Sequence, residues 1–455
     1  MSSFTTINPA TGTPLRSWQY WDEAQIEAGL ALATTTQRRW RHTTFAKRSA
    51  VLHAIAKALA ESGEALAHTM TLEMGKPIGE ARREVQKCAW VCRFYADHAA
   101  EMLSPQTVEA AAPVNEVHFA PLGVVFSVMP WNFPAWQVFR FAAPAWMAGN
   151  AVVMKHAPNT FGTAAALASL CAGAGLPDGL LVDARVDLPQ VPDIIADRRI
   201  AAVTVTGSDR AGRAVAQTAG SHLKKCVLEL GGSDPFIVLD DADLDAAVEA
   251  AVASRCLNNG QSCIAAKRFF VESAVYEPFV SALTNGMNAL KVGDPLQPQV
   301  QLGPLARPDL CALLTRQVRD TLAAGAHALC GGVPDLEGGA FYPPTVLVDI
   351  PPDTPAADEE LFGPVASVWQ VPHEQEAIAR ANASRFGLSA SVWTRSPDRA
   401  RQLAAQLESG GVFVNQSSYS DPRLPFGGIK DSGYGRELGV FGIREFVNVK
   451  TISLR

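Results

Sequence analysis

Residues 225–235, KCVLELGGSDP, decide the fold, because one series of strands ends there and a second begins. Two glycines, an aspartate and a proline directly follow an apolar run. Other short apolar runs, separated by helical patterns, lie at 123–129, 150–155, 200–207, 235–239, 265–272 and 411–415. Such runs are typical of parallel strands that are covered by helices on both faces. We therefore predict two α/β halves that meet in this stretch.

The two ends of the chain have different patterns. Residues 22–110 repeat apolar side chains every three or four positions and are interrupted at Gly75 and Pro77, which predicts helices. The tail 445–455, EFVNVKTISLR, alternates like an edge strand. Because exposed edges are usually paired or covered, we expect this strand to take part in self-association, as a homodimer or homotetramer.

The composition argues against several classes of partner. The 455 residues are 48% hydrophobic and 18% charged, as in a globular protein. A net charge of -6 gives no basic footprint for nucleic acid. The uncharged stretch 119–139 is long enough to cross a bilayer, but its prolines would break a spanning helix. We expect neither a nucleic-acid nor a membrane partner, and no secretory signal is readable.

The cysteines and histidines show no framework or metal pattern. The eight cysteines lack disulfide spacing, and none of the nine histidines forms a zinc-binding cluster with other ligands. We predict no metal site, a reducing compartment and a cytoplasmic location.

Polar residues follow several of the predicted strands, where ligands collect in open α/β sheets. Asn132 follows the run 123–129, Lys155 ends the run 150–155, and Glu229 lies in the boundary stretch. Gly207 and Ser208 join a strand to a helix, so they either bind a phosphate or form an ordinary turn with a serine N-cap. The usual Rossmann and P-loop glycine patterns are absent.

Cys263 lies among small and polar residues in NNGQSCIAAKR, residues 258–268. It is either a buried filler or a nucleophile whose pKa Lys267 and Arg268 could lower. Glu229 is likewise either a salt-bridged carboxylate or a general base, and Asn132 either stabilises its turn or donates to an oxyanion. Together they would supply a nucleophile, a base and an oxyanion donor.

Six motifs in order make the chain resemble the aldehyde dehydrogenase superfamily, nearly from end to end. They are PWNFP (130–134), TGS with a later glycine (206–212), ELGG (229–232), GQSC (260–263), EELFGP (359–364) and PFGGIKDSGYGRE (425–437). The resemblance implies an α/β fold with a doubly wound cofactor domain, an α/β catalytic domain and a small oligomerisation sheet. The cofactor domain is expected at 1–111 and 125–229, and the catalytic domain at 230–424. The oligomerisation sheet is expected at 112–124 and 437–455.

The resemblance also implies catalytic roles for three residues. Cys263 would attack the aldehyde to form a thiohemiacetal, whose oxyanion is stabilised by the Asn132 side chain and the Cys263 backbone N–H. Hydride would pass to a nicotinamide cofactor and leave a thioester, and Glu229 would activate the water that hydrolyses it.

Further residues match cofactor-binding positions of the family. Lys155 and Glu360 correspond to residues that contact the two riboses. Ser208, with Gly207, corresponds to the contact with the pyrophosphate, and Phe362 to a neighbour of the nicotinamide ribose. We count Trp131 among the cofactor-binding residues as well. Pro158 stands where many NAD-preferring relatives carry glutamate, which would repel a 2′-phosphate. NAD and NADP therefore both stay open, with a slight preference for NAD.

The substrate is expected to be a small aldehyde with a distal carboxylate. Arg140 lies eight residues after Asn132, and Arg423 lies in a loop that resembles a substrate-entry loop. Both match features of the short succinate semialdehyde dehydrogenases, and a guanidinium binds a carboxylate through two parallel bonds. A surface salt bridge is the alternative for either arginine.

Several other functions stay open. The substrate could be glutarate semialdehyde or an uncharged aliphatic aldehyde, and an acylating enzyme would transfer its thioester to coenzyme A. A cysteine hydrolase would need a histidine partner, and the nearest candidate, His222, lies far along the sequence from Cys263. A binding protein on a former dehydrogenase scaffold is a further possibility, although no catalytic residue is missing.

Overall fold

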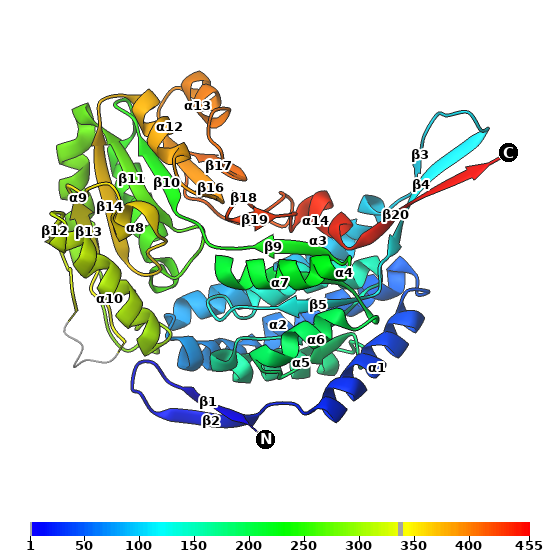
Figure 1. Cartoon of the computed structure of the whole chain (residues 1–455). Helices are drawn as coiled ribbons and strands as arrows, with labels where there is room; N and C mark the ends of the chain where they lie inside the picture. The colour runs from blue at the N-terminus through cyan, green and yellow to red at the C-terminus, as the bar shows by residue number, and fades with distance from the viewer. Residues whose placement is uncertain (1, 335–339) are drawn as a thin grey trace.

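The first large sheet is a doubly wound parallel sheet in the computed structural model, which describes residues 2–334 and 340–455. Its six strands run in the order β19-β9-β8-β5-β6-β7 (Figure 1). Their bounds are β5 Val124–Val128, β6 Ala151–Lys155, β7 Leu181–Asp183, β8 Ile200–Thr206, β9 Lys225–Glu229 and β19 Gly433–Tyr434. All neighbours pair in parallel except β19, which pairs antiparallel with β9.

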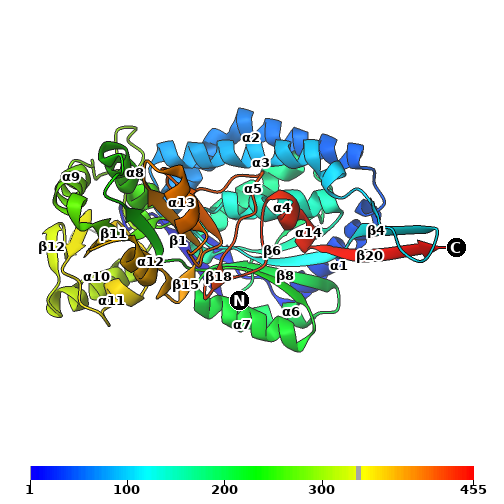
Figure 2. The same ribbon diagram turned by 90° about the horizontal axis from the view of Figure 1, so that it is seen from above.

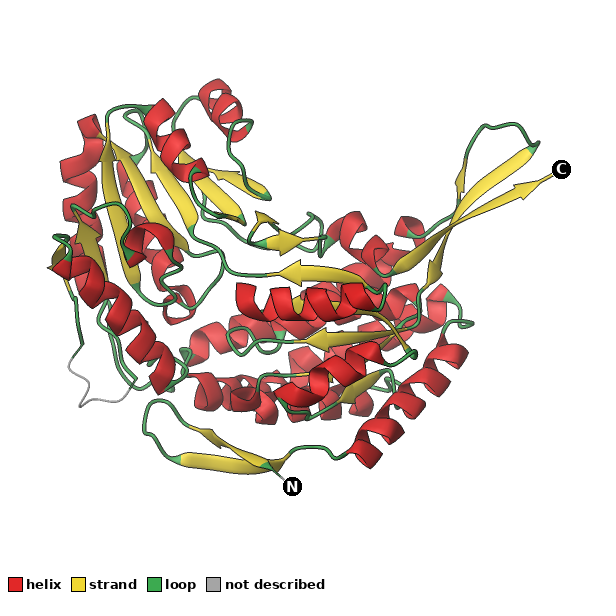
Figure 3. Ribbon diagram, in the orientation of Figure 1, coloured by secondary structure: helices red, strands yellow, loops and turns green. Residues whose placement is uncertain are grey.

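Helices cover this sheet (Figure 3). Three long helices precede it in the chain. They are α1 Glu23–Trp40, α2 Phe45–Met74 and α3 Ile78–Met102, followed by α4 Trp136–Ala148, α5 Phe161–Gly173, α6 Val191–Ala196 and α7 Asp209–Ser221. Gly75 caps α2 in the left-handed conformation, with φ 78°, which favours glycine. The helices predicted within 22–110 are confirmed.

The second large sheet has seven strands in the order β12-β13-β14-β11-β10-β16-β17. Its strands are β10 Asp234–Val238, β11 Ala266–Glu272, β12 His327–Cys330, β13 Thr345–Val348, β14 Val365–Val371, β16 Ser389–Trp393 and β17 Gly411–Val414. The helices of this part include α8 Leu244–Cys256, α9 Tyr276–Asn288, α10 Pro308–Ala323, α12 Glu374–Asn382 and α13 Pro397–Ala404. Only β12 pairs antiparallel among these strands.

The boundary stretch joins the two sheets. The chain leaves the first sheet at β9 and enters the second at β10, four residues after Leu230. The α/β class and the parallel strands are confirmed, whereas the division into domains stays a prediction. None of the described helices is long and apolar enough to cross a membrane.

A three-stranded sheet projects from the rest of the molecule in both views (Figures 1 and 2). It consists of β3 Gln106–Thr107, β4 Val114–Pro121 and β20 Val447–Leu454, in the order β20-β4-β3. The tail is therefore an edge strand, as predicted. The hairpin β1 Ser3–Ile7 and β2 Pro14–Gln19 was not predicted, because its largely exposed side chains give no apolar signal.

Candidate active site

The cysteine loop, residues 257–265, is fixed by the side chains of two asparagines in left-handed conformations. Asn258 and Asn259 have φ of 58° and 59°. The Asn259 amide donates to the carbonyls of Gly75 at 2.9 Å and Pro304 at 2.8 Å, and accepts from a backbone N–H at 2.8 Å. Because asparagine tolerates this conformation better than most residues, the pair both turns the chain and anchors it. The loop that carries Cys263 is thereby held in place.

Lys267 adds a buried positive charge beneath the loop. Its ammonium donates to the carbonyls of Ser262 at 3.0 Å and Cys263 at 2.8 Å, and lies 3.3 Å from Glu360 Oε1. Burial nevertheless raises the pKa of the Cys263 thiol to about 12, and this outweighs the opposing effects of Arg140 and Lys267. The expected lowering of this pKa is therefore not found, and the thiol needs a base.

Arg268 does not act on the thiol. Its guanidinium donates to the backbone carbonyls of Ser233, Arg380 and Ala381. It stabilises the packing of α12 on the sheet instead.

Asn132 lies against the cysteine loop, in the turn between β5 and α4. Its Nδ2 donates to the backbone carbonyl of Gln261 at 3.1 Å, and its backbone carbonyl accepts from Asn258 Nδ2 at 2.8 Å. Since an amide has two N–H donors, one is left for an oxyanion. Glu84 secures the turn by accepting from the first N–H groups of α4, and it forms a buried ion pair with Lys76.

Glu229 ends β9 and is buried, with 2% of its surface exposed. Its Oε1 has no hydrogen-bond partner among the described residues. Burial and the neighbouring Glu437 raise the pKa of Glu229 well above its usual range, while Arg140 opposes the shift. A Cβ at Gly427, whose φ is +150°, would lie 2.6 Å from Glu229 Oε1, so glycine makes room for the carboxylate. A carboxyl group with a raised pKa can accept a proton near neutral pH.

Cys263 opens into a cavity of about 170 Å³, which we call the cysteine cavity. Its walls come from α3, α4, the cysteine loop and the segment 418–426. The lining residues are Glu80, Arg83, Glu84, Lys87, Phe133, Trp136, Gln137, Arg140, Leu257, Ser262, Cys263, Ile264, Ser418, Tyr419, Ser420 and Phe426. No histidine is among these described residues, and His222 is exposed at the end of α7.

The two predicted substrate arginines differ in position. Arg140 lines the cysteine cavity, and its guanidinium forms an ion pair with Glu437; both side chains are 2% exposed. Arg423 is absent from the described lining, is 68% exposed and pairs with Asp421 at 2.6 Å. The structure therefore brings Arg140 to Cys263 but leaves Arg423 at the surface.

The predicted cofactor residues lie at strand ends and helix starts of the first sheet and its surroundings. Lys155 ends β6, and burial lowers the pKa of its ammonium to about 8. Ser208 N-caps α7 by accepting from Ala211 N at 3.3 Å, and Gly207 N donates to the carbonyl of Glu229 at 3.0 Å. The N-terminus of α7 is thus directed toward the edge where an anionic group would bind.

The remaining cofactor candidates come from three other segments of the chain. Trp131 and Phe362 meet edge to face, with ring centroids 5.7 Å apart. Glu360 Oε1 accepts from Gly232 N at 3.0 Å. Pro158 begins a short 3-10 helix, Pro158–Thr160, directly after β6. A buried ammonium, a helix start, a carboxylate and two rings are a set of groups that fits a dinucleotide.

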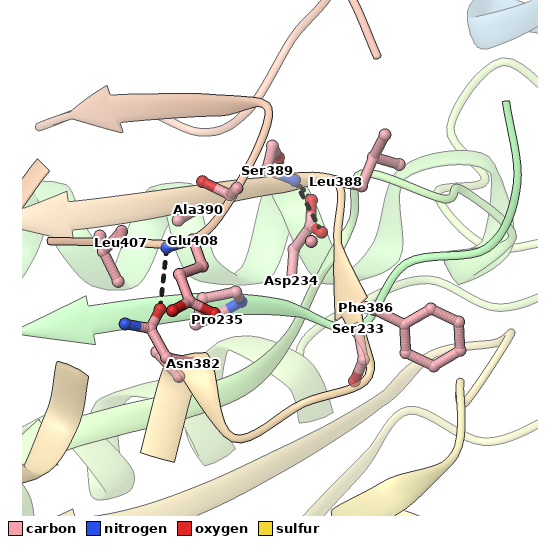
Figure 4. A pocket seen from close by; sticks show the side chains of 13 residues that line it. Ser233, Asp234, Pro235, Asn382, Phe386, Leu388, Ser389, Ala390, Leu407 and Glu408 are labelled. Carbon is pink, nitrogen blue, oxygen red and sulfur yellow. Dashed lines mark hydrogen bonds between the residues drawn. The ribbon is translucent and has the colours of Figure 1, made fainter. Parts of the chain in front are cut away.

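A second small hollow lies at the start of β10 and β16 (Figure 4). Asp234 accepts a hydrogen bond from Ser389 N at 3.1 Å, and the Ser389 hydroxyl is hydrogen-bonded to Ser418 Oγ at 2.5 Å. A Cβ at Gly232 would lie 2.7 Å from the carbonyl oxygen of Cys263. The glycine of the boundary stretch therefore lets the two sheets approach each other at the nucleophile.

The family is decided by comparison with known proteins. The model of the aldehyde dehydrogenase family matches residues 1–452. The chain belongs to the aldehyde dehydrogenase family. A relative named probable succinate-semialdehyde dehydrogenase (NADP+), from Synechocystis sp., is 50% identical over 99% of each chain. Succinate semialdehyde dehydrogenase (NAD(P)+) of Escherichia coli is 48% identical over 98% of this chain and 97% of the relative.

Solved structures of the family agree with this fold. Succinic semialdehyde dehydrogenase from Streptococcus pyogenes, in complex with NADP+, is 37% identical over 99% of each chain, with a TM-score of 0.97. Succinate-semialdehyde dehydrogenase from Burkholderia pseudomallei is 35% identical over 100% of this chain and 94% of the other, with a TM-score of 0.96. The recognised family and the fold class are both confirmed.

The sequence did not identify several residues of the site. The supports of the cysteine loop (Asn258, Asn259) and the partner of Arg140 (Glu437) were missed. Only the asparagines had a local signal, since an Asn-Asn-Gly run favours left-handed conformations. Glu437 and Lys87 reach the site from elements more than 150 residues away from Cys263 in sequence.

Proposed function

We propose that this enzyme oxidises succinate semialdehyde to succinate with a nicotinamide cofactor. The observation that carries the proposal is the cysteine cavity, in which a candidate nucleophile and cationic side chains line one small space. The cavity volume of about 170 Å³ suits a small substrate. The names of the two curated relatives support the same aldehyde.

Each catalytic residue has a task that fits its surroundings. The Cys263 sulfur adds to the aldehyde carbon after its proton is transferred to a base, and the free N–H of Asn132 donates to the resulting oxyanion. A nicotinamide cofactor, when bound, would supply the hydride acceptor that oxidation to the thioester requires. Glu229 takes a proton from the water that attacks the thioester, and the Cys263 thiolate leaves. Arg140 lies close enough to Cys263 and Glu229 to oppose the rise that burial causes in the pKa of both groups.

We propose that NADP binds along Lys155, Pro158, Gly207, Ser208 and Glu360, with Trp131 and Phe362 near the nicotinamide end. Both relatives' names include NADP, which favours it over the NAD preference expected above. Pro158 carries no charge that would repel a 2′-phosphate. NAD stays an alternative cofactor.

We also propose how the chain divides into domains and which segments associate with a second copy. Residues 1–111 and 125–229 form the cofactor domain, residues 230–424 form the catalytic domain, and 112–124 with 437–455 mediate self-association in the cytoplasm. The projecting three-stranded sheet supports the last assignment, because the outer edge of β20 has no paired strand among the described residues.

The test is the rate of cofactor reduction by the wild-type enzyme with two aldehydes and two cofactors. Succinate semialdehyde is compared with butanal, its uncharged analogue, each with NAD and with NADP. We expect kcat/KM to favour the semialdehyde and NADP. Equal values for the two aldehydes would contradict the substrate, and a higher value for glutarate semialdehyde would replace it with a longer one.

A further inference from the structure

Three cationic side chains line the cysteine cavity, and they differ in whether a carboxylate balances them. Arg140 pairs with Glu437, and Arg83 Nη2 lies 3.7 Å from Glu80 Oε1. Lys87 has no carboxylate within ion-pair distance in the part of the chain that the structure describes; its ammonium donates to Ser420 Oγ at 2.7 Å. The unbalanced positive charge of the cavity therefore lies on Lys87.

The carboxylates nearest to Lys87 already have other partners. Glu84, one turn earlier on α3, pairs with Lys76 and accepts from two backbone N–H groups of α4. Asp421 forms two hydrogen bonds with Arg423, at 2.8 and 2.6 Å. Neither carboxylate is free to turn toward the ammonium, so a compensating anion has to come from outside the chain.

The surroundings of Lys87 hold its ammonium at the cavity wall. The nitrogen lies 4.4 Å from the centre of the Trp136 ring, which attracts a cation through its face. Trp136, on α4, and Ser420, in the segment 418–426, both line the cysteine cavity. Burial also lowers the pKa of Lys87 to about 8, which indicates an ammonium that has lost part of its hydration. A partly dehydrated cation gains more from an anion than an exposed one does.

Arg140 has a different electrostatic environment. Its charge is shared with Glu437 and lies close to Cys263 and Glu229, where it opposes the rise that burial causes in the pKa of both groups. A guanidinium balanced in this way is suited to stabilising the reacting groups. It is less suited to attracting the substrate carboxylate, because Glu437, Glu229 and that carboxylate would then surround a single cation.

Building on the function proposed above, we propose that Lys87, together with the hydroxyl of Ser420, binds the distal carboxylate of the aldehyde. Arg140 then serves mainly as a positioning residue for Cys263 and Glu229. The charge that distinguishes succinate semialdehyde from butanal is thus recognised by α3, a helix that carries no family motif used above.

The test is the ratio of kcat/KM for succinate semialdehyde to kcat/KM for butanal, measured with NADP. Lys87→Met keeps most of the side-chain length and removes the charge, so the ratio is expected to fall about 10- to 100-fold. The value for butanal should change by less than about twofold, which also reports that the variant is folded. Lys87→Arg should restore most of the ratio. Arg83→Met, on the same helix and lining the same cavity, is the matched control and should leave the ratio unchanged.

The outcomes separate this proposal from the function on which it rests. A high wild-type ratio that survives in Lys87→Met but is lost in Arg140→Ala would overturn the role of Lys87 and leave the substrate intact. A wild-type ratio near one would overturn both. A parallel loss for both aldehydes in Lys87→Met would make Lys87 a structural residue and would also contradict the proposal.

Discussion

The cysteine loop and the helical wall of α3 and α4 face the same cavity but are stabilised differently. The loop is held by hydrogen bonds from Asn258, Asn259 and Lys267 to backbone carbonyls. The wall is held by ion pairs, and one of its cations, Lys87, lacks a carboxylate partner among the described residues. Hydrogen bonds fix a position, whereas an unbalanced charge selects a ligand. We therefore expect the loop to control reactivity toward every aldehyde, and the wall to control selectivity.

The largest expected effect comes from removing the nucleophile of the loop. Cys263→Ala should lower kcat/KM for succinate semialdehyde and butanal alike, by about 10⁴-fold or more, because no other described thiol lines the cavity. Cofactor reduction measures the loss, and calorimetric titration with NADP controls for an intact cofactor site. Residual activity above about one hundredth of wild type would contradict the role of the loop as the source of reactivity.

A support of the loop should have the next largest effect. Asn259→Ala removes three hydrogen bonds, leaves the buried carbonyls of Gly75 and Pro304 without this donor, and places alanine at φ 59°. We expect a loss of about 3 kcal/mol in stability, seen as a lower thermal midpoint, and a lower kcat for both aldehydes.

The control for this variant separates the two causes. Asn259→Gly suits the left-handed backbone and lacks the side chain, so its midpoint should lie between those of Asn259→Ala and wild type. The ratio of the two aldehydes should stay at the wild-type value in both variants. A changed ratio would mean that the loop also contributes to selectivity.

Sequence patterns predicted those parts of the site that are local in the chain. The strands before Asn132, Lys155 and Ser208 and the turn around Cys263 follow from nearby apolar periodicity and glycine. The pairing of Arg140 with Glu437 joins residues almost 300 positions apart, through the antiparallel return of β19 to β9. Such a contact depends on tertiary packing, which periodicity does not describe.

The prediction that neighbouring cations could lower the pKa of Cys263 failed for a similar reason. Lys267 is four residues from Cys263 in sequence, its ammonium donates to the Cys263 backbone carbonyl, and its charge acts in the predicted direction. Burial has the larger effect, and α4 and the segment 418–426, which line the cavity together with Cys263, are not close to it along the chain. Desolvation is a sum over distant segments, so local charge patterns underestimate it.

A change at the cofactor side tests whether aldehyde selectivity resides in the wall alone. Pro158→Glu introduces a carboxylate after β6, where repulsion of a 2′-phosphate should lower kcat/KM for NADP about tenfold and leave that for NAD nearly unchanged. Pro158→Gln is the neutral control and should behave like wild type. Equal losses in both variants would indicate that the residue acts through the turn and not through charge. The aldehyde ratio should be unaffected throughout.

The smallest expected effect is the pH dependence of the wall. The charged groups facing Lys87 are Glu84 from α3, Arg140 from α4 and Asp421 from the segment after β17, and the titratable Cys88 of α3 has a pKa raised well above its usual range by burial. Burial is the main cause that lowers the pKa of Lys87 to about 8, and Arg140 adds to it. Since a lysine loses its charge as pH rises through its pKa, carboxylate binding is complete below about pH 7 and declines above it.

The quantity to measure is again the ratio of kcat/KM for the two aldehydes, because ionisation of Cys263 and Glu229 affects both substrates and cancels, and kcat/KM reports the free enzyme. From about pH 7 to about pH 8.5 the charged fraction of a group with a pKa of about 8 falls about fourfold, and the ratio should fall with it. In Lys87→Arg the guanidinium stays charged over this range, so the ratio should be flat. If the ratio does not change with pH in the wild type either, the substrate carboxylate binds a group that stays charged over this range. Arg140 would then be the residue that determines aldehyde selectivity.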